Sequence, residues 1–338
     1  MNIPYRTRRR LTRLGVAVLI AVLIFALIAG LWMLWAKRYV IYTRDGALLD
    51  FDLPEELPAG TEALPPKAEA VAPLYFVTEE DALTNSTELL QMKGYYADAD
   101  ALKNIPAVKE QIQQLEAGTA VMLDVKSIYG NYFYSSSVGS TRSSAIDIEA
   151  MDALITYLKN SKYYLIARLP ALRDREYGLH HTNDGIAVKS GGYLWVDDEG
   201  CYWLNPASQG TISHLVQIAT ELKDLGFDEV VFYDYRFPDT DNMAFSGDKA
   251  KALTSAAQTL VTTCSTERFA VSFVSKNHFT APTGRTRIYW EGADAYQAAD
   301  VASNAGVADP KINLVFLTEV HDTRFDEFSV LRPLEAAH

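Results

Sequence analysis

Charged side chains follow apolar, strand-like runs at several places in this sequence. In residues 226–238, GFDEVVFYDYRFP, a glycine ends a helical pattern, a buried-type strand follows, and Asp234 and Arg236 come just before a proline. Other charged groups that follow apolar runs are Asp124, Lys126, Arg168, Asp174, Glu291 and Glu319. Paired carboxyl groups, one protonated and one charged, are what the hydrolysis of a glycosidic bond requires. These residue types at strand ends therefore indicate acid–base chemistry.

Asp234 is the first candidate for a catalytic carboxylate. Its candidate partner acids are Glu291 and Glu319, and Asp124 is a further catalytic candidate. Because a nearby cation lowers the pKa of a carboxyl group, we expect Arg236 to hold Asp234 ionised, while the partner acid would need a drier setting. Buried charges are usually paired, so the alternative is a set of ion pairs that orient loops, for example Arg168 and Arg236 with Asp124 and Asp234.

Aromatic residues near these positions could stack on sugar rings. The candidates are Trp195, Trp203, Trp290 and Tyr235, with Tyr129 and Tyr132 beside them. The alternative is packing in the core or in a lid, which is the commoner role of aromatic side chains. Because Trp195 and Trp203 flank the turn at residues 198–200, we expect a β-hairpin insertion there.

No cofactor is expected from the sequence. It contains no GxGxxG, Walker or GxSxG pattern, which weakens the dinucleotide, phosphate-binding and serine hydrolase interpretations. His180 and His181 lack a third spaced ligand, so no metal is expected. Cys201 and Cys264 have no metal-type spacing, and they could form one disulfide or remain two separate buried thiols.

Strand and helix patterns alternate over roughly residues 74–333. Apolar runs predict strands at 74–77, 120–125, 163–167, 230–232, 269–274, 287–290 and 312–317, with 328–331 as a weak eighth candidate. Helical stripes separate several of them, and Asp147 could cap the helix that follows it. This alternation predicts a parallel sheet, and its length suits a (β/α)8 TIM-like barrel. An incomplete or distorted barrel, or a doubly wound open sheet, remains an alternative.

In a barrel of this kind, the carboxyl ends of the strands form the mouth, where active sites are built. The charged candidates would therefore gather at the mouth. Asp228 and Glu229 begin the central strand, so we expect them at the opposite end, the stabilising floor of the barrel.

The N-terminal part of the chain predicts a membrane anchor. Residues 15–36 are 22 residues without a charge, long enough for a helix of about 33 Å, and five arginines precede them. We expect residues 1–14 to be a cytoplasmic basic tail and 15–36 an uncleaved signal anchor, with the rest of the chain outside the cell. Residues 37–53 predict a juxtamembrane hairpin, and the proline-rich residues 54–73 predict a semi-rigid linker.

The charge of the chain is unevenly distributed. Seven of the 31 basic residues lie within residues 1–38, which leaves 24 basic against 43 acidic residues in the remainder, a net charge of −19. So acidic a domain repels phosphate backbones, which argues against a nucleic-acid partner. Neutral or cationic ligands fit it better.

Four blocks of the sequence resemble a known family. They are AVMLDVKSIYGNYFYSS, YYLIARLPALRD, WVDDEGCYWLNP and GFDEVVFYDYRFP, in this order between residues 120 and 238. They resemble successive blocks of the bacterial "putative glycoside hydrolase" domain family, exported or membrane-anchored barrels related to the α-amylase-like glycosidases. The resemblance implies a barrel that acts on carbohydrate, either an α-linked glucan or a cell-surface glycan. It carries over Asp124 as a catalytic candidate, and Lys126, Arg168, Asp174 and Arg236 as substrate-binding candidates.

The fourth block departs from the family pattern. The family usually has FDYIRFP where this chain has FYDYRFP, so Tyr233 takes the acidic position and the carboxylate moves to Asp234. One step along a strand turns a side chain to the other face. Either a local bulge recovers Asp234, or the barrel has lost its acid there. The fifth predicted strand, at 269–274, also lacks the proton-donating Glu that amylase-like enzymes place near its end.

The sequence therefore predicts a membrane-anchored, extracytoplasmic glycoside hydrolase. One alternative is a degenerate barrel that binds glycan without cleaving it, motivated by Tyr233 and by the fifth strand. The other alternative is a structural envelope protein whose barrel contacts other proteins.

Overall fold

A computed structural model describes residues 40–43, 46–49 and 86–334. The chain divides into two compact units, Met1–Leu74 and Tyr75–His338. In the first, β1 (Val40–Thr43) and β2 (Gly46–Leu49) pair as an antiparallel two-stranded sheet. The predicted anchor at 15–36, the linker at 54–73 and the strand at 74–77 lie outside the described residues. Within the described ranges, no helix has the length and apolar character needed to cross a membrane.

The second unit is a closed barrel of parallel strands, which confirms the (β/α)8 prediction and excludes the open-sheet alternative. Its strands follow the order β10-β3-β4-β5-β6-β7-β8-β9. They are β3 (Lys93–Ala97), β4 (Ala120–Asp124), β5 (Tyr164–Pro170), β6 (Glu229–Tyr233), β7 (Ala270–Val274), β8 (Ile288–Glu291), β9 (Leu314–Leu317) and β10 (Ser329–Pro333).

The last and the first strand of the barrel differ in how well the sequence predicted them. The weak eighth candidate is confirmed, because β10 closes the barrel by pairing with both β9 and β3. The first strand of the closed barrel is β3, which the sequence analysis did not pick out, and the predicted strand at 74–77 is among the residues outside the described ranges. The sequence of β3, KGYYA, is not an apolar run. Gly94 is required there because a Cβ at this position would lie 2.0 Å from the Ala120 carbonyl oxygen of the next strand.

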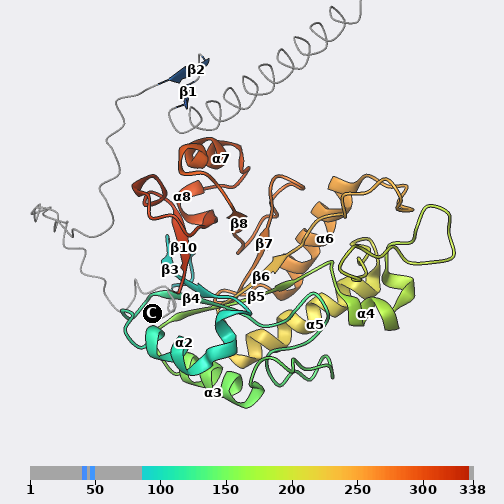
Figure 1. Ribbon diagram of the computed structural model, residues 1–338, viewed down its shortest axis with the longest axis horizontal. Helices are drawn as coiled ribbons and strands as arrows, with labels where there is room; N and C mark the ends of the chain where they lie inside the picture. The colour runs from blue at the N-terminus through green and yellow to red at the C-terminus, as the bar shows by residue number, and fades with distance from the viewer. Residues whose placement is uncertain (1–39, 44–45, 50–85, 335–338) are drawn as a thin grey trace, which may run out of the picture. The chain divides into compact units, whose positions relative to one another are not determined.

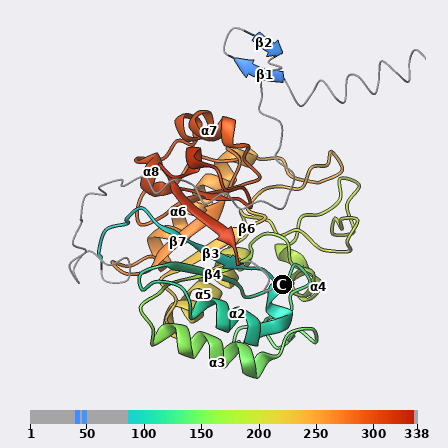
Figure 2. The ribbon, with the colours of Figure 1, turned by 60° about the vertical axis from the view of Figure 1, so that its left-hand side comes forward.

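Helices cover the outside of the barrel. They are α2 (Ile105–Ile112), α3 (Ile148–Lys159), α4 (Arg175–His180), α5 (Gln209–Leu225), α6 (Lys249–Cys264), α7 (Ala298–Asn304) and α8 (Pro310–Asn313). In Figures 1 and 2, α2, α3 and α5 lie on one side of the strands, and α7 and α8 lie on the other. Asp147 caps α3 by accepting a hydrogen bond from the Ala150 backbone, as predicted. Gly226 ends α5 in the left-handed conformation, with φ of 97°.

Alternation along the strands separates two apolar cores. The larger one lies between strands and helices and contains residues such as Leu123, Ala167 and Phe232. The smaller one fills the barrel interior with Met92, Ala120, Met122, Tyr164, Ile166, Val231, Tyr289, Val315, Leu317 and Leu331. Because side chains alternate, the next inward position after Met122 is Asp124, after Ile166 it is Arg168, and after Val231 it is Tyr233.

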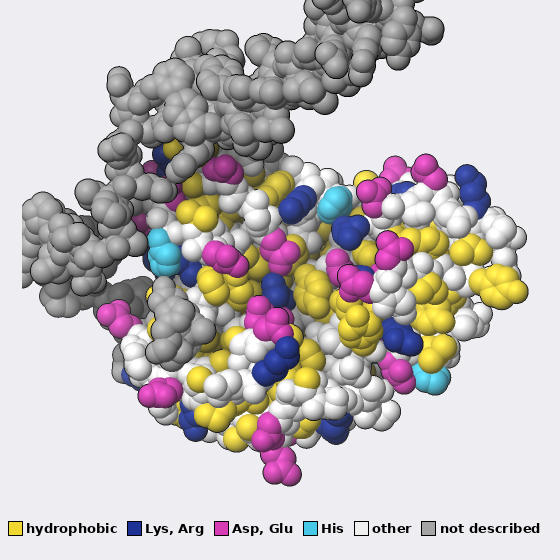
Figure 3. All heavy atoms as spheres, in the orientation of Figure 1, with side chains coloured by type: hydrophobic (Ala, Val, Ile, Leu, Met, Phe, Trp, Pro, Cys, Tyr) yellow, Lys and Arg dark blue, Asp and Glu magenta, His cyan; other side chains and the backbone are white. Residues whose placement is uncertain are grey.

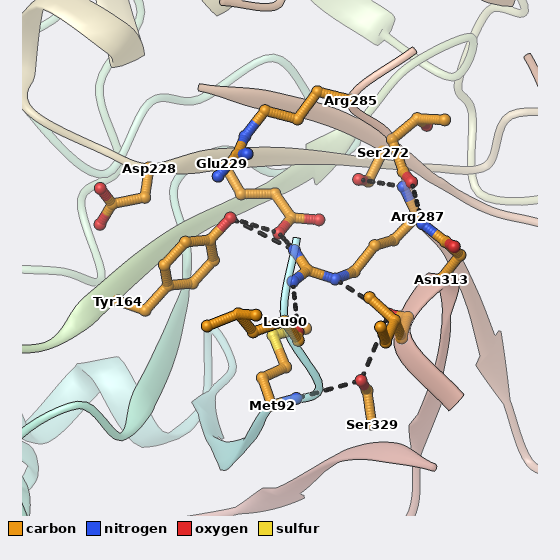
Figure 4. A network of polar contacts seen from close by, with 12 residues as sticks. Leu90, Met92, Tyr164, Asp228, Glu229, Ser272, Arg285, Arg287, Asn313 and Ser329 are labelled. Carbon is orange, nitrogen blue, oxygen red and sulfur yellow. Dashed lines mark hydrogen bonds and ion pairs between the residues drawn. The ribbon is translucent and has the colours of Figure 1, made fainter. Parts of the chain in front are cut away.

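The floor of the barrel holds a buried ion pair that includes Glu229, which was expected at this end of the central strand. Glu229 is fully buried and accepts hydrogen bonds from Arg287 Nη1 at 2.5 Å and from the hydroxyls of Tyr164 and Tyr289, each at 3.0 Å. Arg287 also donates to the Leu90 carbonyl oxygen at 2.9 Å (Figure 4). Both charges are therefore paired and hydrogen-bonded, which offsets the cost of removing them from water.

The long connection between β5 and α5 is less regular than a hairpin insertion. It contains isolated antiparallel bridges, among them Ala187 with Leu194 and Val196 with Tyr202, rather than paired strands. The two cysteines, Cys201 and Cys264, are buried free thiols, so the two-thiol alternative holds and the disulfide does not.

Candidate functional site

Arg168 is the central charge at the barrel mouth. It lies on β5, and its Nε donates to Asp124 Oδ1 at 2.6 Å while Nη2 donates to Oδ2 at 3.2 Å. Its Nη1 donates to Glu291 Oε1 at 3.0 Å. Asp124 also accepts from the Ala99 backbone at 3.1 Å. The structure thus brings three predicted residues together, and for Asp124 with Arg168 the ion-pair alternative is confirmed.

Two tyrosines flank this guanidinium. The guanidinium carbon of Arg168, Cζ, lies 5.8 Å from the ring centre of Tyr96 and 5.4 Å from that of Tyr233. Burial raises the pKa of Tyr233, and the carboxylates of Asp124, Asp234 and Glu291 raise it further, against the opposing effect of Arg168. The Tyr233 hydroxyl therefore stays protonated at neutral pH.

Asp234 follows the last residue of β6 in a left-handed backbone conformation, with φ of 49°. Its Oδ2 lies 3.7 Å from Arg173 Nη1, and its Oδ1 lies 3.8 Å from Arg236 Nε. Burial raises the pKa of Asp234 more than the two arginines lower it. Arg236 lowers this pKa, as expected, but burial has the larger effect, so the net shift of the pKa of Asp234 is upward.

Tyr233, not Asp234, thus occupies the inward position of β6. Asp234 follows it in a left-handed backbone conformation, and its carboxylate lies beside Arg173 and Arg236. Arg173 and Asp197, which the sequence analysis missed, complete this group: Arg173 Nε donates to Asp197 Oδ2 at 2.6 Å. A signal for Arg173 was available in the sequence, because it directly precedes the candidate Asp174 in LPALRD.

Most of the predicted sugar-stacking aromatics are packed instead. Tyr235 is 1% exposed, and its hydroxyl donates to the Leu253 carbonyl oxygen at 2.9 Å, so it belongs to the core. Trp203 is buried under Arg236, whose guanidinium carbon lies 4.9 Å from its ring, with Trp195 tilted against it at 6.4 Å. Trp290 packs half-buried against the outer core. A binding role for Tyr235 and Trp203 is therefore corrected to packing, because neither ring face is open.

Arg168 forms no ion pair with the other predicted residues that the structure describes, Glu319, Lys126 and Asp174. Glu319 follows β9 and is exposed, and its charge helps burial to raise the pKa of Tyr96. Lys126 and Asp174 form a buried ion pair in a separate pocket beside α4 and α5. Acidic and basic side chains are interspersed with hydrophobic ones over the middle of the face drawn in Figure 3.

No cluster of three or more His, Cys, Asp or Glu residues within the described part of the chain could hold a metal ion. His180 Nε2 lies 3.2 Å from Glu176 Oε1, and His181 stacks on Tyr177 with ring centres 4.1 Å apart.

A closed barrel of eight parallel strands with helices on its outside is a (β/α)8 barrel, and in this one carboxylates and arginines pair at the carboxyl ends of the strands. The chain belongs to the family described as "Putative glycosyl hydrolase domain", which matches residues 95–278. No curated protein matches the chain.

Several solved structures resemble the barrel. A hypothetical protein from Ruminiclostridium thermocellum is 19% identical over 53% of this chain and 96% of its own, with a TM-score of 0.45. The glycoside hydrolase domain of PelA from Pseudomonas aeruginosa is 14% identical over 73% of this chain and 96% of its own, with a TM-score of 0.40. A GH20 beta-N-acetylhexosaminidase from Streptomyces coelicolor is 12% identical over 68% of this chain, with a TM-score of 0.41, and this chain covers 48% of it. Likenesses this distant say nothing about the ligand of this chain.

Proposed function

We propose that the protein is a glycoside hydrolase whose catalytic pair is Asp234 and Glu291. The observation that carries the proposal is that two carboxyl groups lie at the ends of β6 and β8, one with a pKa raised by burial and the other half-exposed and paired with an arginine. Burial raises the pKa of Asp234, whereas the half-exposed Glu291 is paired with Arg168 at 3.0 Å. Asp234 would protonate the leaving oxygen, and Glu291 would act as the charged carboxylate. Glu319 is the other candidate for the second role.

Arg168 and Asp124 are positioning residues in this proposal. Asp124 is 7% exposed and fixes two nitrogens of Arg168, which leaves the third nitrogen to orient Glu291. Arg236 would contact substrate at the rim, because its side chain is more exposed than that of Asp234. The substrate we propose is a neutral or cationic glycan, α-linked or on the cell surface, in keeping with the acidic balance outside residues 1–38.

We place the barrel outside the cytoplasm, anchored by residues 15–36. The uncharged 22-residue run and the five arginines before it support this proposal. Full-length protein should stay in the membrane fraction after alkaline carbonate washing, and protease added to intact spheroplasts should digest the barrel. Release by carbonate would contradict the anchor, and protection from protease would contradict the orientation.

Hydrolysis of a glycan panel by the full-length protein tests the catalytic proposal. Released reducing ends should fall at least about 100-fold in Asp234→Asn and in Glu291→Gln. Asp239→Asn, an exposed aspartate on the same loop as Asp234, and Glu319→Gln are the matched controls and should keep activity. Loss of activity in Glu319→Gln but not in Glu291→Gln would move the second role to Glu319. Wild-type activity in Asp234→Asn would remove Asp234 from the mechanism.

A second candidate function is glycan binding without cleavage. It is favoured by Tyr233, which fills the inward position of β6, and by the inward residues of β7, Ser272 and Val274, neither of which is an acid. Saturable glycan binding with no released reducing ends would support it. Absence of any glycan affinity would point instead to a structural envelope protein that contacts other proteins.

A further inference from the structure

A second polar pocket lies outside the mouth. It has a volume of about 530 Å³ and is enclosed by the loop after β4, by α4 and by the first turns of α5. Two adjacent residues of one loop contact different sites. Arg173 lies beside Asp234 at the mouth, whereas Asp174 lines the pocket and pairs with Lys126. The pocket therefore shares a loop with the mouth but none of the proposed catalytic groups.

A buried ion pair forms the wall of this pocket. Lys126 Nζ donates to Asp174 Oδ2, and both side chains are 2% exposed. Burial alone would raise the pKa of Asp174, but Lys126 and the nearby His214 together outweigh it, and the pKa lies below its ordinary value. Burial lowers the pKa of His214 against the opposing effect of Asp174, so its imidazole is neutral at pH 7. The wall thus carries no uncompensated charge.

Two buried polar atoms in the pocket have no hydrogen-bond partner among the residues that the structure describes. They are the hydroxyl of Tyr132, which is 3% exposed, and Nε2 of His214, which is 8% exposed. His214 Nε2 lies 3.6 Å from Asp174 Oδ2, beyond hydrogen-bond reach. Orphaned buried groups are rare in native proteins and call for an explanation such as a bound ligand.

The orientation of the imidazole is fixed by stacking. The ring of His214 lies 3.9 Å from that of Tyr177, with an interplanar angle of 18°. The Tyr177 hydroxyl is in turn held by Asp184 at 3.0 Å and by the Gly210 carbonyl oxygen at 3.1 Å. His214 therefore cannot turn to find another partner without breaking this stack.

The two orphaned groups complement a single kind of ligand group. An alcohol hydroxyl both donates and accepts hydrogen bonds, so one placed between the Tyr132 hydroxyl and His214 Nε2 can satisfy both in either tautomer of the imidazole. The remaining charged groups that line the pocket, Glu176 and Asp184, are acidic and disfavour an anion. Hydroxyl side chains of Ser140, Thr141 and Ser213 complete the lining.

We propose that this pocket binds one uncharged, hydroxyl-rich unit, a neutral pyranose, at a site separate from the mouth. One hydroxyl of the sugar would bridge Tyr132 Oη and His214 Nε2, and others would reach the serine and threonine side chains. The proposal goes beyond the proposed hydrolysis, because the pocket would hold its sugar whether or not the mouth cleaves a glycan.

Ligand-observed NMR titration of the full-length protein tests the proposal. The detergent should lack a sugar headgroup, and the probes are glucose, galactose and N-acetylglucosamine, with glucuronate as the anionic comparison. We expect saturable binding of at least one neutral sugar in preference to glucuronate. Tyr132→Phe should weaken binding about tenfold, which corresponds to the loss of one hydrogen bond. Its melting temperature without sugar should stay the same or rise, because the removed hydroxyl has no partner.

Tyr134→Phe is the matched control. Tyr134 contacts Tyr132 edge-on at 5.8 Å but bonds to Glu221 at 2.7 Å, so its loss should lower the melting temperature and leave the sugar affinity unchanged. Ser213→Trp, on an exposed position of α5 that lines the pocket, should abolish binding by filling it.

No binding of any neutral sugar, stronger binding of glucuronate, or wild-type affinity in both Tyr132→Phe and Ser213→Trp would overturn the proposal. Loss of the binding signal in Glu291→Gln would assign the sugar to the mouth and would overturn it as well. Failure of the hydrolysis assay alone leaves the sugar titration unaffected, so the two proposals fail separately.

Discussion

Arg168 reaches across the barrel to Glu291, with Nη1 and Oε1 3.0 Å apart, although β5 and β8 are separated by two intervening strands. The other side of the same guanidinium is fixed by Asp124. One arginine therefore ties opposite walls of the mouth together, and the carboxylate of Glu291 is oriented without being buried.

Glu291→Gln should separate activity from stability. The Glu291 side chain is 42% exposed, so its pair with Arg168 should contribute less than about 1 kcal/mol to the free energy of unfolding. Removing its charge should nevertheless lower glycan hydrolysis at least about 100-fold. Urea unfolding together with a reducing-end assay measures both. A large loss of stability with activity intact would reverse the assignment.

The activity should fall as pH rises through the pKa of Asp234. Because burial raises this pKa, the carboxyl keeps its proton to a higher pH than an ordinary aspartate, and the protonated form is the one that can donate. A pH–rate profile of the wild type should show this descending limb, and residual activity of Asp234→Asn should lack it. A limb that persists unchanged in Asp234→Asn must come from another group.

Asp228→Asn should stabilise the protein at neutral pH. Burial raises the pKa of Asp228 to about 6, against a hydrogen bond from the Leu165 backbone. Because the folded-state pKa lies above the unfolded value, the folded protein binds the proton more tightly, and wild-type stability falls as pH rises from about 4 to about 6.

The gain in Asp228→Asn should therefore be small at pH 4 and reach at most about 3 kcal/mol above pH 6. The asparagine keeps an oxygen for the Leu165 N–H. Urea titrations at several pH values measure the difference, and a pH-independent difference would show that the pKa of Asp228 is not raised.

Arg287→Met should destabilise the barrel by about 3 to 5 kcal/mol, because it leaves the Glu229 carboxylate buried without its cation. Lys103→Met is the control, since Lys103 pairs with Asp100 at the surface and its loss should not change unfolding measurably. Equal unfolding curves for the two variants would mean that the floor ion pair does not hold the barrel together.

The sequence was sufficient to predict the helices and strands whose apolar residues recur with a helical or strand period. Strands β4 to β9 are apolar runs, α3 and α5 have apolar stripes with a cap or a terminal glycine, and these features arise from neighbours in the chain. Strand β3 was missed because its fit depends on a glycine that only the adjacent strand explains. Charged residues at strand ends could likewise be placed at the mouth, because a parallel barrel puts all those ends on one face.

Which of those charged residues meet was decided only by the tertiary structure. Asp124 and Lys126 are two positions apart in the sequence, yet one pairs with Arg168 at the mouth and the other with Asp174 in a separate pocket. The direction of the pKa shift of Asp234 also required the fold, because burial and two arginines act on it with opposite signs. A sequence fixes residue types and local periodicity, whereas the distances and solvent exposure that set electrostatic energies depend on segments brought together from across the chain.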